Sequence, residues 1–111
     1  MIEKIILDYL KTKLAVPVYM EEPVDAPGSF VLIEKTGSGR ENYIQASTFA
    51  FQSYAESLYE AALLNETLKN VIDSLIVLDD IGQVRLNSDY NFTDTTTKRY
   101  RYQAVYDITH Y

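Results

Sequence analysis

The stretch "KRYRYQAVYDITH" (residues 98–110) decides the fold, because tyrosines and apolar residues recur in it at intervals of two. On a β-strand, successive side chains point to opposite faces of the sheet. One face would carry Tyr100, Tyr102, Ala104, Tyr106 and Ile108, and the other would carry Arg99, Arg101, Gln103, Val105 and Asp107. The first set predicts a sheet face buried under helices. The second predicts a face open to water or to another chain.

The strands around this stretch are predicted as two hairpins. Residues 83–92 would pair with 98–110 around the turn "TDTTT" (93–97), because aspartate and threonine favour turns. Residues 29–36 and 43–53 predict a second hairpin, with "GSGREN" (37–42) as its flexible tip. In the returning strand, alternation places on one face the residues Tyr43, Gln45, Ser47, Phe49 and Phe51.

Two amphipathic helices are predicted from apolar residues spaced by three and four. The first covers residues 2–14 and ends before Pro17, since the residue before a proline is disfavoured in a helix. The second covers about 54–76, with Asn65 interrupting its apolar stripe. Ser53 would be its N-cap, with Glu56 three residues later. The stripe consists of Leu58, Ala61, Ala62, Leu68, Val71, Ile72 and Leu75.

The remaining segments complete the predicted architecture. Residues 16–22 ("VPVYMEE") predict a short strand that begins at Pro17 or lies at a sheet edge, and 23–28 and 79–82 predict turns. The order is helix, strand, hairpin, long helix, hairpin. It predicts one α+β domain over residues 1–111: a four- to five-stranded, mostly antiparallel sheet with two helices packed on one face.

Composition excludes several function classes. The 111 residues contain no cysteine, which removes disulfides, thiolate metal sites and a cysteine nucleophile. The net charge of −6 opposes non-specific DNA binding and attachment to anionic membranes. No apolar run approaches the roughly 20 residues that cross a bilayer. The first residues do not have the pattern of a signal peptide, because charges interrupt the apolar ones.

Candidate chemistry is sparse. "GSGR" (37–40) lacks the G-K-[ST] ending of a phosphate loop, so a mobile hairpin loop is expected there. His110 is the only histidine and is expected to be a solvated terminal side chain, with no role in activating the serines or threonines. The acidic pairs Glu21-Glu22 and Asp79-Asp80 do not form a shared cation site in this reading. We therefore expect no enzyme activity, no cofactor and no metal.

Three readings of the tyrosine and arginine strand remain open at this point. It could stack on single-stranded nucleic acid, form ordinary core and surface, or present a face to another protein. Stacking platforms combine aromatic and cationic side chains, but here the tyrosines and arginines are expected on opposite faces. Tyrosine and arginine are enriched at protein interfaces.

Four stretches, taken in order, resemble the small tail-terminator or tail-completion proteins of siphophages and of prophages in Gram-positive bacteria. They are "VPVYMEEP" (16–23), "FVLIEKTGSG" (30–39), "FQSYAESLYEAALLNETLKNVI" (51–72) and "LNSDYNFTDTTTKRYRYQAVYDI" (86–108). Such proteins are often labelled minor tail, minor capsid or head–tail joining proteins. The resemblance lies in the order of the elements and in the general sequence pattern. It covers nearly the whole chain and includes no catalytic signature.

The resemblance implies a six-fold ring that caps the tail tube and meets the head connector. DNA would pass through it without specific binding, no membrane would be involved, and the protein would belong to the virion after assembly in the bacterial cytoplasm. The loop 36–43, the tip 93–98 and the outward side chains of the last strand are the expected contacts. The alternative is a monomeric peptide- or ligand-binding module that uses 16–22 as an edge strand. The expected interface residues are Thr36, Gly37, Ser38, Gly39, Arg40, Thr95, Thr96, Lys98, Arg99, Arg101 and Gln103.

Overall fold

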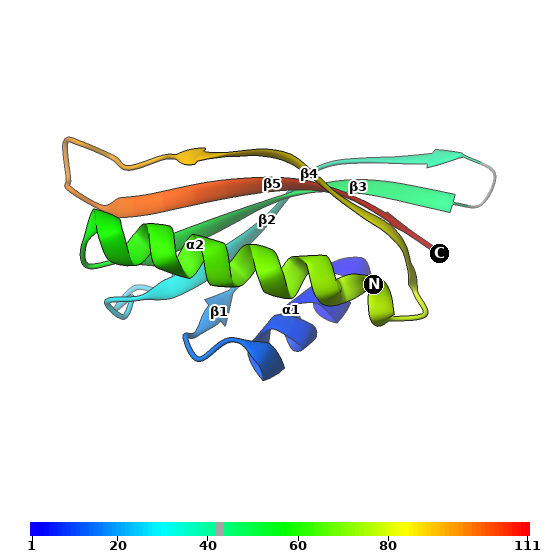
Figure 1. Cartoon of the computed structure of the whole chain (residues 1–111), viewed down its shortest axis with the longest axis horizontal. Coiled ribbons are helices and arrows are strands. Elements are labelled where there is room, and N and C mark those ends of the chain that lie inside the picture. The colour runs from blue at the N-terminus through cyan, green and yellow to red at the C-terminus, as the bar shows by residue number, and fades with distance from the viewer. Residues whose placement is uncertain (42–43) are drawn as a thin grey trace.

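Five strands form one mixed, mostly antiparallel sheet, and two helices cover one of its faces (Figure 1). The structure, a computed structural model, describes residues 1–41 and 44–111. It confirms the predicted α+β class. The elements are α1 (Ile2–Lys13), β1 (Val18–Tyr19), β2 (Phe30–Glu41), β3 (Ile44–Ala55), α2 (Leu58–Asp73), the 3-10 helix η1 (Ser74–Val77), β4 (Ile81–Asn91) and β5 (Tyr100–His110).

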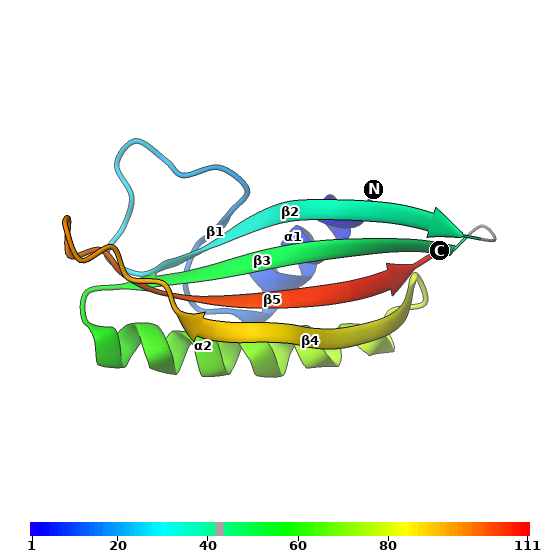
Figure 2. The ribbon, with the colours of Figure 1, turned by 90° about the horizontal axis from the view of Figure 1, so that it is seen from above.

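The strand order β1-β2-β3-β5-β4 places the last strand between β3 and β4. The chain leaves β3, passes along α2 on the helical side, and returns as β4 (Figure 2). The pairs β2–β3, β3–β5 and β5–β4 are antiparallel, and β1 runs parallel to β2. Consequently β2 and β5 point one way along the sheet, while β3 and β4 point the other way.

The core lies between the sheet and the two helices, as the alternating pattern of β5 predicts. Tyr106 and Ala104 pair with Phe49 and Phe51 of β3, and all four are almost completely buried. Burying one large apolar side chain contributes about 1.5–3 kcal/mol. Tyr100 is only half-buried, since it lies at the end of β5. The helices add Ile6, Leu10, Leu68 and Ile72 to this core.

The start of α2 differs from the prediction. Ser57 is the N-cap, and its side chain accepts a hydrogen bond from the backbone N–H of Glu60 at 3.1 Å. Ser53 is instead fully buried inside β3, because pairing with β5 keeps β3 extended through Ala55. The sequence contains the capping spacing at both serines, and the sheet decides which one is used. The helix ends at Asp73 and continues as η1.

Two predicted loop and strand boundaries were also wrong. The segment 37–42 is mainly strand, because β2 runs to Glu41 and pairs with β3 on both sides of a bulge at Thr36. The expected loop therefore shrinks, and Asn42 and Tyr43 lie outside the described residues. The strand expected at 16–22 is reduced to Val18–Tyr19.

Asn65 interrupts the apolar stripe of α2 because it ties the helix to β4. The Asn65 side chain is 1% exposed, and its Nδ2 donates to Oδ1 of Asp89 at 2.6 Å. Lys69, one turn along the helix, binds the other carboxylate oxygen of Asp89. These bonds satisfy the buried Nδ2 donor of Asn65 and hold β4 against α2.

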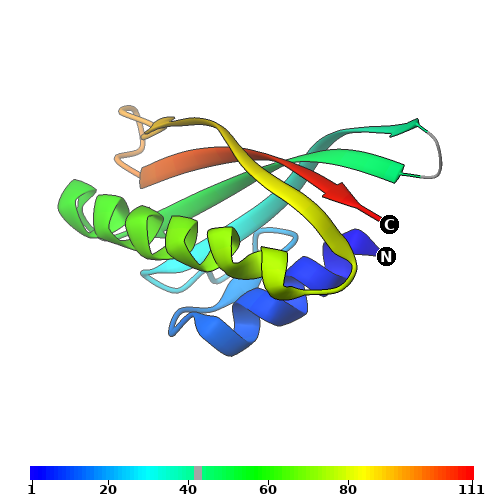
Figure 3. The same cartoon turned by 45° about the vertical axis from the view of Figure 1, so that its right-hand side comes forward.

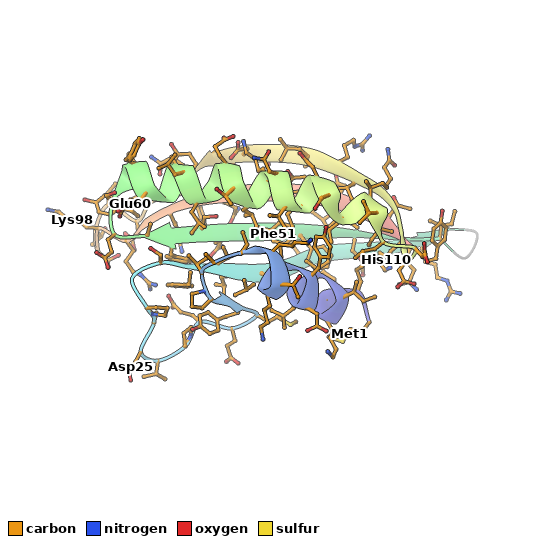
Figure 4. The ribbon with its side chains drawn as sticks, turned by 60° about the horizontal axis from the view of Figure 1, so that its bottom comes forward. Met1, Asp25, Phe51, Glu60, Lys98 and His110 are labelled. Carbon is orange, nitrogen blue, oxygen red and sulfur yellow. The ribbon has the colours of Figure 1, made fainter. Side chains whose placement is uncertain are left out.

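The molecule is elongated, with principal extents of 44 × 25 × 25 Å. At one end β2 and β3 continue past both helices, and at the other end lies the turn between β4 and β5 (Figure 3). Lys98 lies at the end with the turn, and His110 lies toward the other end, short of the projecting tip of β2 and β3 (Figure 4).

Candidate functional site

The sheet face turned away from the helices, which we call the open face, carries a continuous set of side-chain contacts across all five strands. Tyr90 of β4 accepts a hydrogen bond from Gln103 of β5, and Oε1 of Gln103 accepts from Nε2 of Gln52 at 2.9 Å. Oε1 of Gln52 in turn accepts from the Tyr54 hydroxyl at 3.1 Å. The Tyr54 ring stacks on Phe30 of β2, with ring centroids 4.5 Å apart.

Tyr19 of β1 completes this set by packing edge-on against Phe30, with ring centroids 5.9 Å apart. We call these six residues the open-face ladder: Tyr19, Phe30, Gln52, Tyr54, Tyr90 and Gln103. Although no helix covers them, Gln52 and Tyr54 are only 7% and 5% exposed. Their neighbours on the same face shield them, so these two side chains are ordered by contacts within the chain.

Arg101 holds the middle of the open-face ladder at Tyr54. Its Nη1 donates to the Tyr54 hydroxyl at 2.6 Å, and its Nε donates to the carbonyl oxygen of Phe92 at 2.7 Å. The guanidinium also lies 4.4 Å from the centre of the Phe92 ring, within the range of a cation–π contact. Arg101, one of the predicted interface residues, therefore has a structural role within the chain.

Arg99 joins the loop before β2 to the start of β5. It forms an ion pair with Glu22, and its guanidinium lies 4.9 Å from the centre of the Tyr54 ring. The hydrogen bond from Arg99 lowers the pKa of Glu22 and raises the pKa of Arg99 itself. Both side chains remain about two-fifths exposed, so the pair adds little stability in water but orients the guanidinium.

The crowded threonines form the turn between β4 and β5. The Asp94 carboxylate accepts backbone hydrogen bonds from Thr96 at 2.9 Å and Thr97 at 3.4 Å. The Thr96 hydrogen bond is the main cause that lowers the pKa of Asp94. Lys98 closes the turn with a φ of 56°, in the left-handed region that non-glycine residues rarely adopt. The predicted tip is thus an ordered turn.

The predicted residues 36–40 lie at the far end of the sheet, in β2. All five are exposed, and the Thr36 hydroxyl donates to the carbonyl oxygen of Thr48 at 3.3 Å. Neither glycine of this stretch has a positive φ, and a side chain at Gly37 or Gly39 would meet no atom within 4 Å. A strand conformation with this exposure does not form a phosphate-binding loop.

The predicted interface residues therefore do not form one patch. Residues 36–40 lie at one end of the molecule, Thr95, Thr96 and Lys98 lie at the other, and Arg101 and Gln103 lie on the open face between them.

His110 does not have the solvated environment expected for it. Its ring is 5% exposed and shares a hydrogen bond with the Ser47 hydroxyl, with Nε2 and Oγ 2.9 Å apart. Burial is the main cause that lowers the pKa of His110. The sequence contained the signal, since His110 continues the alternation of Tyr106 and Ile108. The structure therefore places a histidine beside a serine. Ser47 is itself only 3% exposed, so the pair is buried and not open to solvent.

Two surface hollows accompany these features. One, of about 380 Å³, lies between the loop 22–28 and the start of β5, and Phe30, Tyr54, Tyr100 and Arg99 line it. The other, of about 500 Å³, lies beside His110 and is lined by charged side chains, among them Glu3, Lys35 and Asp80.

Metal and membrane chemistry find no support in the part of the chain that the structure describes. Residues 1–41 and 44–111 contain no cluster of three histidine, aspartate or glutamate side chains suited to a metal ion. Over the same residues, neither helix has the length and apolar character needed to cross a bilayer.

No family model matches the sequence, and a search of curated proteins finds no significant match.

Proposed function

We propose that this protein is a structural subunit of a phage or prophage tail. Copies of it would form a ring on the end of the tail tube and join the tube to the head connector. The single observation that carries the proposal is the open-face ladder together with Arg101. It is a helix-free surface in which tyrosine, glutamine and arginine side chains are already ordered. The resemblance of the sequence to tail-terminator proteins supports the same reading.

The physical properties of this surface suit a protein-binding role. Tyrosine and arginine dominate the energetically important residues of many interfaces. Side chains that are held in place by hydrogen bonds lose less conformational entropy when a partner binds. The net charge of −6 also suits a ring that DNA passes through, because like charges disfavour a lasting contact with the phosphate backbone.

Light scattering over a range of protein concentrations, with and without tail-tube protein, tests the proposal. We expect rings or tube-bound assemblies from the unchanged chain. The double variant Arg99→Glu and Arg101→Glu loses the hydrogen bond to the Tyr54 hydroxyl and should be less stable. It should still fold, because the core on the helical face is unaffected, yet fail to assemble. The matched control is Lys4→Glu and Lys11→Glu, which makes the same charge change on exposed positions of α1. A chain that stays monomeric with and without tubes would contradict the proposal.

A second candidate function is a monomeric binding module, favoured by the hollow of about 380 Å³ beside Arg99 and Tyr54. Its aromatic walls and its cation could hold a peptide or a small acidic ligand. This alternative predicts a monomer at all concentrations and saturable binding that Arg99→Glu abolishes. Assembly that depends on tube protein would instead exclude it as the main role.

A further inference from the structure

Both outer edges of the sheet are open along most of their length. β1 pairs with β2 only at Val31 and Leu32, which leaves 33–41 without a partner strand on that side. At the opposite edge, β4 pairs only with β5. Both statements refer to the described ranges 1–41 and 44–111. Unpaired strand edges present free backbone N–H and C=O groups, on which another strand can add.

The strand directions determine how two copies of the chain can meet. β2 points one way along the sheet and β4 points the other way. When subunits are related by rotation about an axis that runs along the strands, each copy keeps the same direction. β4 of one copy then meets β2 of the next as an antiparallel pair, in which hydrogen bonds lie perpendicular to the strands.

This head-to-tail arrangement is also the one that covers both edges. A closed ring built in this way has no free strand edge left. A two-fold dimer through β4 and its copy would leave the β2 edge of each subunit open. The β4 edge, with 11 residues, is comparable in length to the open part of β2 at 33–41.

Charge and space at the two edges favour a second copy of this chain as the partner. By sequence, 33–41 contains Lys35 and Arg40 against two glutamates and is neutral, and in β4 the charges of Arg85 and Asp89 also cancel. Two chains of net charge −6 can therefore approach through these edges without local repulsion. A Cβ added at Gly37 or Gly39 would meet no atom within 4 Å, so the sheet face at these two residues also has room for a neighbouring subunit.

We infer that the outer edge of β4 in one subunit pairs antiparallel with the outer edge of β2, at residues 33–41, in the next subunit. This inference rests on the proposed ring function and specifies its subunit contact. It also gives a role to the predicted interface residues 36–40, which lie on the open edge of β2 and not in a loop. The ring contact is then mainly between backbones.

Backbone orientation provides a sharp test of this contact. The N–H of Val31 points to the outer edge, since it donates to the carbonyl oxygen of Pro17 at 2.9 Å. Outward groups recur at alternate residues, and the one-residue shift at the Thr36 bulge moves the alternation onto Ser38. Ser38→Pro therefore removes an outward donor and leaves the hydrogen bonds to β3 in place. Ser38→Ala is the matched control, because it loses the hydroxyl and keeps the N–H.

We expect Ser38→Pro to raise the concentration at half-assembly about tenfold or more, since it removes a hydrogen bond and adds a steric conflict at every contact. Ser38→Ala should assemble like the unchanged chain. The melting temperature and circular dichroism of both variants should match the unchanged chain. Assembly of Ser38→Pro at normal concentration would overturn the inference.

Disulfide trapping gives a second, independent readout, because the chain has no cysteine of its own. Copies carrying Gly37→Cys would be mixed with copies carrying Gln83→Cys, Arg85→Cys or Asn87→Cys. These exposed positions of β4 lie on the open face, as residue 37 does by the strand register. At least one mixture should give cross-linked dimers under oxidation, while each variant alone should not.

The outcomes separate the inference from the proposed function. Cross-linking of Arg85→Cys with itself would indicate a two-fold β4 contact, and rings without any cross-link would place the contact elsewhere. Either result overturns the inferred pairing and leaves the ring function standing. A chain that never assembles, with or without tube protein, contradicts both.

Discussion

The two faces of the sheet are stabilised in different ways. The helix-covered face is apolar, and its central residues, such as Phe49, Phe51 and Tyr106, are at most 1% exposed. The open face is held by hydrogen bonds and ring contacts among side chains of the open-face ladder. The same strands build both faces, because alternate residues point to opposite sides.

Under the proposed function, this difference separates folding, on the covered face, from recognition, on the open face. Burial of apolar area under the helices provides most of the favourable free energy of folding. The open face then needs only enough internal bonding to keep its polar side chains in place. We therefore expect substitutions on the two faces to differ in the size of their effect on stability and in whether they affect assembly.

The largest expected effect comes from Phe51→Ala, which should lower the free energy of unfolding by about 3–5 kcal/mol because it leaves a cavity in the core. Tyr90→Ala, on the open face and 40% exposed, should cost about 1 kcal/mol. Chemical denaturation of both variants measures the difference. Equal losses would show that the two faces are not distinct in this way.

A smaller effect is expected for Tyr54→Phe. The ring still stacks on Phe30, but the hydroxyl that links Arg101 to Gln52 is lost. Leaving the buried Gln52 oxygen without its donor and the half-buried Arg101 without this acceptor should cost about 1–3 kcal/mol. Tyr59→Phe, on a 73% exposed position of α2, is the control and should change nothing measurable. If Tyr54→Phe is as stable as that control, the ladder does not order the open face.

The smallest effect concerns pH and His110, at the end of the covered face. Burial and the nearby Lys35 and amino terminus lower the pKa of His110, while Glu3 opposes them. The unfolded chain therefore takes up the proton first as pH falls, and stability should decrease as the pH drops below the ordinary histidine pKa of about 6.5. His110→Gln should reduce this pH dependence of the denaturation midpoint. An unchanged pH dependence in this variant would exclude His110 as its source.

Local patterns in the sequence were sufficient to predict the α+β class of the fold. Period-two alternation in residues 98–110 identifies the strand and its buried face, since it depends only on strand geometry. The strand order and the insertion of β5 between β3 and β4 were not predictable in this way. They depend on packing between segments far apart in the chain.

The candidate site was predictable only in part, for the same reason. The outward position of Arg101 and Gln103 follows from alternation within one strand. The ion pair between Arg99 and Glu22 joins residues 77 positions apart, and no local pattern reveals it. Ser53 and Ser57 show the limit most directly, because both have the capping spacing and only the length of β3 selects Ser57.

The hydrogen bond between Gln52 and Gln103 has a consequence for how this surface can evolve. Each amide satisfies its neighbour across two strands, so a change at one position leaves the other with an unmet bond. Substitutions tolerated here should therefore arise in compensating pairs, and they should appear as correlated positions once many related sequences are compared.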